Sequence, residues 1–145
     1  MSQQKTYDNR LGLKGWWMGG RWGIERYLYT LHRLTGLGLV AYFTLHILVT
    51  SSRAFGQAAW ERWMATVGNP ILHVGEYFVV VAFIFHALNG IRLVLIELGF
   101  AVGQAEEPIY PYKTSLNRQR PLVVLVMLAA AVLVVFSGYD FWFAD

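Results

Sequence analysis

The sequence predicts an all-α membrane protein with three transmembrane helices and an N-terminal interfacial segment. The 145-residue chain is 56% hydrophobic and only 14% charged, and a domain of this size has too little interior to bury so much apolar surface. Residues 34–52, 74–96 and 121–139 are long stretches almost without ionisable side chains, each close to the ~20 residues that cross a bilayer as a helix. A soluble three-helix bundle is the alternative, but it would carry polar stripes, and residues 122–136 have none.

The N-terminal part, residues 1–33, is expected to be a cytoplasmic tail that ends in an interfacial aromatic segment at residues 15–29. The first ten residues are polar and contain no apolar core of a signal peptide, so no cleaved signal is expected. The aromatic residues of the segment are typical of the headgroup level of a membrane. They are Trp16, Trp17, Trp22, Tyr27 and Tyr29.

Each span is bounded by polar or charged residues. The first, 34–52, lies between Arg33 and Arg53, and the second, 74–96, contains Glu76 near its start and Arg92 near its end. The remaining segments are predicted as an outer loop at 53–73, a cytoplasmic loop at 97–120, a third span at 121–139 and an outer tail at 140–145.

The distribution of positive charge predicts the orientation. Ten Lys and Arg residues fall in the N-terminal part, at the end of the second span and in loop 97–120, whereas only Arg53 and Arg62 fall on the other side. Because cytoplasmic flanks carry the excess of Lys and Arg, the N-terminus is expected in the cytoplasm and the C-terminus outside.

Composition also excludes several kinds of site. The chain has no cysteine, which rules out disulfides, thiolate metal sites and covalent haem attachment. A transporter or channel would need ionisable residues along a path through the spans, and only histidines are available there. No nucleic-acid partner is expected.

The most informative side chain is His86, near the middle of the second span. On a helix it shares one face with Asn89 and Gly90. A neutral imidazole at this depth either forms a hydrogen bond to another helix or ligates a metal. Gly90 leaves room for a flat group such as a haem against the helix, and both interpretations remain open.

His32 and Arg33 stand at the cytoplasmic start of the first span. Such cations can simply snorkel to the interface. Alternatively, the pair holds an anion or polar head group, for example a haem propionate or a quinone carbonyl. Gly36 and Gly38 follow, and small residues on membrane helices usually indicate close packing with another helix.

Two motifs in this region resemble a known family. Leu31-His32-Arg33-Leu34-Thr35-Gly36 resembles the His-Arg-x-Ser/Thr-Gly signature in the first span of succinate dehydrogenase cytochrome b subunits. Residues 85–92, Phe-His-Ala-Leu-Asn-Gly-Ile-Arg, resemble that family's second signature, His-x-x-x-Gly-Ile-Arg. The two motifs occur in the expected order and the resemblance covers residues 26–99.

The resemblance implies an anchor subunit that passes electrons from an iron–sulfur subunit to membrane quinone, while a flavoprotein subunit oxidises succinate. It also implies a second small membrane-anchor chain and a prokaryotic plasma membrane. Carried over by motif, His86 would be the axial ligand of a b-type haem. Arg33 would line the quinone pocket and, with His32, contact the haem propionates. A haem-free structural anchor is the alternative.

Three positions depart from the family pattern. The family often has Ser three residues before the motif histidine, where this chain has Tyr29, with Thr30 next to it at the edge of the expected quinone pocket. Leu93 replaces a frequent second histidine, and Glu97 replaces the usual Asp. The contacts to the quinone head group are therefore expected to differ from the common form.

His46 lies in the outer half of the first span, and two-haem relatives have a ligand in that region. Counting along the predicted spans places His46 and His86 about 8 Å apart in depth, so one haem is not expected to use both. His46 is either the ligand of a second haem or a hydrogen-bonded structural residue. His73, beside Glu76 at the outer surface, is expected to form a solvated pair.

Overall fold

The computed structural model describes residues 12–13, 23–104, 107, 109–111 and 114–144. Within these residues every regular element is helical. The elements are α2 (Ile24–Ser51), the short 3-10 helix η1 (Ser52–Phe55), α3 (Gln57–Val67), α4 (Pro70–Glu97) and α5 (Leu116–Phe143). Helices α2, α4 and α5 are long and apolar enough to cross a membrane. The predicted all-α membrane fold with three spans is confirmed.

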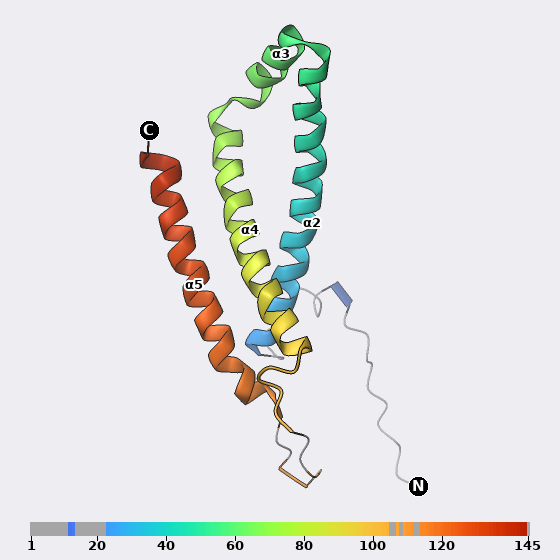
Figure 1. Ribbon diagram of the computed structural model, residues 1–145, viewed down its shortest axis with the longest axis vertical. Coiled ribbons are helices and arrows are strands. Elements are labelled where there is room, and N and C mark those ends of the chain that lie inside the picture. Colours follow the sequence, from blue (N-terminus) through green and yellow to red (C-terminus); the bar gives the residue numbers. More distant parts are fainter. Residues whose placement is uncertain (1–11, 14–22, 105–106, 108, 112–113, 145) are drawn as a thin grey trace.

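The three long helices run antiparallel in chain order, with α4 packed against both α2 and α5 (Figure 1). The end where α2 begins, α4 ends and α5 begins is called the proximal end below. The opposite end, where η1 and α3 connect α2 to α4, is called the distal end, and α5 finishes at that end. The proximal half of α2 therefore lies beside the second half of α4.

Helix α2 begins at Ile24, ten residues before the predicted first span, and it includes Arg26 and Arg33. Both guanidinium groups lie over the ring of Tyr29, at 5.2 and 4.4 Å from its centroid. Arginine is a good helix former, so the helix continues through these charged positions. Of the predicted interfacial segment, residues 24–29 form the first turns of α2, whereas residues 15–22 lie outside the described part of the chain.

The distal connection, predicted as a loop over residues 53–73, contains helix α3. Its larger side chains, Trp60, Trp63, Met64 and Val67, follow the i, i+3, i+4, i+7 spacing of one helix face, which is the sequence signal for this element. The Arg53 guanidinium lies 4.1 Å from the ring centroid of Trp60 and ties η1 to α3. The connection is therefore a folded cap.

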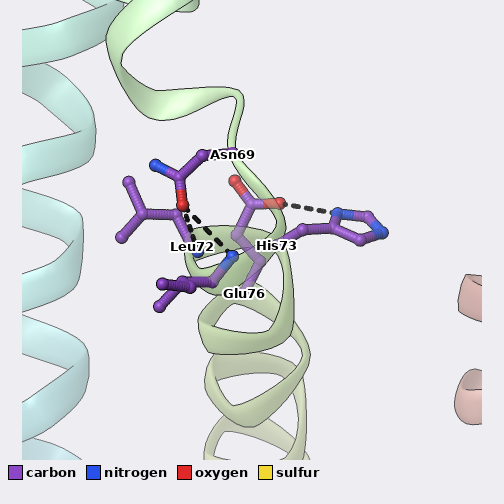
Figure 2. Close-up of polar contacts among 5 residues, drawn as sticks. Asn69, Leu72, His73 and Glu76 are labelled. Atoms are coloured by element: carbon purple, nitrogen blue, oxygen red, sulfur yellow. Dashed lines mark hydrogen bonds and ion pairs between the residues drawn. The ribbon is translucent and has the colours of Figure 1, made fainter.

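The start of α4 is set by a strong N-cap. The side-chain oxygen of Asn69 accepts hydrogen bonds from the backbone nitrogens of Ile71 and Leu72, both at 3.1 Å (Figure 2). Pro70 occupies the first helical position, where its missing N–H costs no hydrogen bond. These residues begin the helix four positions before the predicted span at residue 74.

Helix α5 is attached to α4 through Tyr77. The Tyr77 hydroxyl donates a hydrogen bond of 3.0 Å to the carbonyl oxygen of Val134. A Cβ atom at Gly138 would lie 2.6 Å from the same hydroxyl, so only glycine leaves room for the ring there. The missing side chain at residue 138 thus allows the close approach of the two helices.

Most of the apolar surface of the three long helices is exposed. Within the most apolar stretch of each helix, only 6%, 11% and 17% of the residues of α2, α4 and α5 are buried. Water cannot solvate three helices with such surfaces, which excludes the soluble bundle. Lipid and neighbouring chains must cover them, and the chain is a multi-pass membrane protein.

Candidate functional site

His86 extends from α4 toward the backbone of α2. Its Nδ1 atom lies 3.0 Å from the carbonyl oxygen of His32 and 3.2 Å from Oγ1 of Thr35. A carbonyl oxygen can only accept, so Nδ1 carries the proton and donates. The neutral ring then has its lone pair on Nε2, which has no hydrogen-bond partner among the described residues. The contact with α2 therefore determines which nitrogen is available to a ligand.

The imidazole rings of His32 and His86 stack face to face. Their centroids are 3.9 Å apart and their planes differ by 5°. Each ring lies against a glycine of the other helix. A Cβ atom at Gly36 would lie 2.8 Å from Cε1 of His86, and one at Gly90 would lie 3.6 Å from Cε1 of His32. The space in front of Gly90, expected from the sequence to receive a flat cofactor, is filled by the His32 ring.

The two glycines of the first motif have different surroundings. Gly36 faces His86, in agreement with the expected close packing of helices. No atom of the described residues lies within 4 Å of a Cβ built at Gly38. Gly38 is therefore on a face of α2 that α4 and α5 leave open.

Below His86, toward the proximal end, α4 carries a buried polar pair that sequence reasoning missed. Asn89 is 0% exposed and Arg92 is 5% exposed, and Nε of Arg92 donates a hydrogen bond of 3.0 Å to Oδ1 of Asn89. This bond fixes the orientation of the amide, whose Nδ2 atom is buried without a partner among the described residues. A charged residue inside an apolar span was the available sequence signal.

An ion pair joins α2 and α5 at the proximal end. Nε of Arg120 lies 3.2 Å from Oε1 of Glu25. The Glu25 carboxylate also attracts the Arg92 guanidinium of α4. Glu25, Arg92 and Arg120 thus bring opposite charges from all three long helices to the proximal end.

The residues predicted to line a quinone pocket lie on two faces of α2. Arg33 and Tyr29 are exposed and in contact, as described above, whereas Thr30 is buried at 5% exposure. His32 is half-buried, and its Nδ1 atom has no hydrogen-bond partner among the described residues. Arg33 and His32 are therefore neighbours in sequence, but only His32 takes part in the α2–α4 contact.

His46 lies far from the histidine pair. Gly36 is the residue of α2 that lies beside His86. His46 follows Gly36 by ten residues, which corresponds to ~15 Å along the axis of α2. The separation exceeds the expected 8 Å because α2 begins at Ile24 and His46 is correspondingly further toward its distal end. The His46 side chain is exposed and stacks on Tyr42, with 5.6 Å between centroids. His46 and His86 cannot share an iron in this arrangement.

His73 and Glu76 form the expected exposed pair, with 3.4 Å between Nδ1 and Oε2 (Figure 2). The sequence did not predict the aromatic contacts of His73. Its ring stacks on Phe141 at 4.5 Å and meets the edge of Trp142 at 5.3 Å. His73 therefore helps to join α4 to α5 at the distal end.

A haem fits the donor set around His86. No group of three or more His, Asp or Glu side chains gathers among the described residues, so a bare metal ion would lack ligands. A porphyrin brings four nitrogens of its own and needs only an axial ligand from the chain. His86 has the form typical of such a ligand, with Nδ1–H held by a backbone carbonyl and Nε2 carrying the lone pair.

Comparison with known proteins identifies the family. Residues 13–135 match the succinate dehydrogenase/fumarate reductase transmembrane subunit family. The chain belongs to this family. Both motifs and all three long helices begin within the matched region, so the match covers the histidine pair and the spans that hold it.

Two relatives agree with this family assignment. The chain is 33% identical over 69 residues to the succinate dehydrogenase 2 membrane subunit SdhC of Mycobacterium tuberculosis, covering 48% of this chain and 51% of the relative. It is 28% identical over 95 residues to a succinate dehydrogenase hydrophobic membrane anchor subunit of Halobacterium salinarum, covering 63% and 73%. The chain thus aligns with about half the length of the first relative. No solved structure gives a significant match.

Proposed function

We propose that this anchor subunit binds haem b and passes electrons from the iron–sulfur subunit of a succinate:quinone oxidoreductase to membrane quinone. One observation carries the proposal. The Nδ1 atom of His86 is held by the His32 carbonyl, which leaves a lone pair on Nε2 inside a membrane-spanning helix pair. A lone pair without a partner in an apolar environment is costly unless a ligand uses it.

When bound, haem b would supply a one-electron carrier between the iron–sulfur subunit and quinone. His86 would be its axial ligand from this chain. His32 would not supply a second ligand to the same iron, because its ring stacks on that of His86 with 3.9 Å between the centroids. The second ligand would therefore come from the second small anchor chain. The half-buried His32, with its unpartnered Nδ1, and Arg33 would contact the propionates.

The proposed quinone pocket is at the proximal end of α2. The exposed Arg33 guanidinium is held over the Tyr29 ring, so its donors occupy a limited region at the surface of the helix. A guanidinium can donate hydrogen bonds to a quinone carbonyl or to its reduced oxygen. Tyr29 and Thr30 would form the edge of the pocket, with Tyr29 in place of the serine frequent in the family.

The proposed assembly comprises a flavoprotein subunit, an iron–sulfur subunit, this chain and a second small anchor chain. The proposed location is a prokaryotic plasma membrane with the N-terminus in the cytoplasm. Ten of the twelve Lys and Arg residues support that orientation, because the order of the spans along the chain assigns them to the proximal side of the membrane. The iron–sulfur subunit would then dock at the proximal end, near Arg33 and the histidine pair.

A second haem is proposed at His46 only if the partner chain supplies a matching histidine in its distal half. The ~15 Å along α2 between His46 and Gly36 leaves room for two separate haems. The exposed His46 ring is open to a neighbouring chain.

The visible spectrum of the purified complex tests the proposal against its alternative, a haem-free structural anchor. A reduced b-type haem gives a sharp alpha band, and pyridine haemochrome analysis gives the number of haems per flavin. At least one haem per flavin is expected. A fully assembled, active complex without an alpha band would establish the haem-free anchor instead.

A further inference from the structure

We infer that Thr35 is a positioning residue for His86: its hydroxyl oxygen accepts from Nδ1–H of His86 and thereby sets the ring orientation and ligand strength of Nε2. The inference rests on the proposed haem function and deepens it. Thr35 occupies the Ser/Thr position of the first motif, but only the fold shows that its hydroxyl lies 3.2 Å from Nδ1 of His86.

The hydroxyl of Thr35 is oriented by its own helix. Its oxygen lies 2.8 Å from the carbonyl oxygen of Leu31 and 3.0 Å from that of His32, and its single proton is donated to these carbonyls. A hydroxyl oxygen whose proton is used in this way presents lone pairs to other neighbours. The neighbour is Nδ1 of His86, which carries a proton.

The opposite arrangement, with Thr35 donating to an unprotonated Nδ1, is unfavourable. The same Nδ1 lies 3.0 Å from the His32 carbonyl oxygen. An unprotonated nitrogen would direct its lone pair at a lone pair of that oxygen, and the two would repel each other. Nδ1–H is therefore shared between two acceptors on α2, one from the backbone and one from a side chain. The two acceptor atoms lie 3.0 Å from each other on α2, and Nδ1 of His86 contacts both.

Sharing the proton has a consequence for a bound iron. An imidazole that donates from Nδ1 to acceptors gains electron density on Nε2 and becomes a stronger ligand to ferric iron. Second-shell hydrogen bonding is one of the means by which a protein changes the reduction potential of a haem. Loss of the Thr35 oxygen leaves only the His32 carbonyl, so the ferric state is less stabilised and the haem midpoint potential becomes more positive.

The same helix provides a matched control. Thr44 makes the same bond to the carbonyl four residues earlier, with 2.8 Å from its Oγ1 to the oxygen of Val40, as threonines in membrane helices commonly do. Among the described residues Thr44 makes no hydrogen bond to another helix, and it lies on an exposed part of α2. Replacing either threonine by valine keeps the shape of the side chain and removes the hydroxyl.

The experiment compares the purified whole complex carrying wild-type chain, Thr35→Val, Thr35→Ser or Thr44→Val. The readouts are haem per flavin, the midpoint potential from optical redox titration and the EPR g values of the oxidised haem. Thr35→Val is expected to raise the potential, shift the g values and reduce haem affinity by roughly tenfold. Thr35→Ser and Thr44→Val are expected to match the wild type.

Failure of the proposed haem function and failure of the role of Thr35 give different results. A wild-type complex without haem would overturn the proposed function and this inference with it. A haem-replete Thr35→Val complex with unchanged potential and g values would overturn the inference alone, as would an equal shift in Thr44→Val. Should Thr35→Val fail to assemble, Thr35→Ala, which removes the hydroxyl and favours helix, serves as the second test with the same expected shift.

Discussion

The rings of His32 and His86 lie parallel at 3.9 Å between α2 and α4, and each lies against a glycine of the opposite helix. A Cβ atom at Gly36 would clash with His86, whereas one at Gly90 would make an ordinary contact with His32. The two sequence motifs therefore form one contact, in which only Gly36 must be small. Two of the four predictions below, for Gly36→Ala and His86→Ala, change residues of this contact.

Gly36→Ala is expected to displace His86. The added Cβ atom would lie 2.8 Å from Cε1 of the ring, closer than real Cβ contacts, so the ring must move away from its acceptors on α2. Haem per flavin is expected to fall, and the alpha band of the remainder is expected to shift. Gly38→Ala is the control, since its Cβ meets no atom of the described residues within 4 Å. Identical spectra in both variants would show that the Gly36–His86 contact does not position a ligand.

Arg33→Ala is expected to slow quinone reduction by about tenfold or more, the size expected when a hydrogen bond from a charged group is lost. Succinate oxidation with a soluble artificial acceptor is expected to stay near the wild-type rate, because the dicarboxylate site belongs to another subunit. Arg53→Ala is the control, since Arg53 also lies over an aromatic ring but at the distal end. Equal losses in the two assays would indicate failed assembly, and Arg33 would then have no assigned role at quinone.

His46→Ala tests the second haem. With two haems per flavin in the wild type, this variant is expected to retain one, because His46 and His86 are too far apart along the membrane to share an iron. His73→Ala, also a distal histidine, is expected to keep both. A wild-type ratio of one haem per flavin that is unchanged in His46→Ala would reduce His46 to a residue that packs on Tyr42.

The sequence was sufficient to predict the three spans and their order, because uninterrupted apolar length is a direct consequence of bilayer thickness. It was less informative about where the helices begin. Charge-free stretches suggested a start at residue 34, whereas α2 begins at Ile24 and includes Arg26 and Arg33, because charged residues end an apolar stretch without ending a helix. The larger side chains of α3 follow a helical spacing in the sequence, but a search for long apolar stretches does not detect it.

The motifs indicated which histidines matter, but not how they meet. Spacing along one helix placed His86 and Gly90 on a common face and suggested an open space there. Only the crossing of α2 and α4 determines that His32 fills this space and that Thr35 reaches Nδ1 of His86. The Asn89–Arg92 bond joins residues one turn apart on α4, and the packing of the helices is what buries both side chains.

The most direct test of the haem assignment is the reduced-minus-oxidised visible spectrum of the complex carrying His86→Ala. The variant should still insert and assemble, which succinate oxidation by a soluble acceptor verifies, because alanine favours helix and the apolar length of α4 is unchanged. Since Nε2 of His86 is the only ligand proposed from this chain for the proximal haem, the alpha band of that haem is expected to disappear or to change strongly in position and amplitude. An alpha band identical to that of the wild type, in an assembled complex, would contradict the assignment.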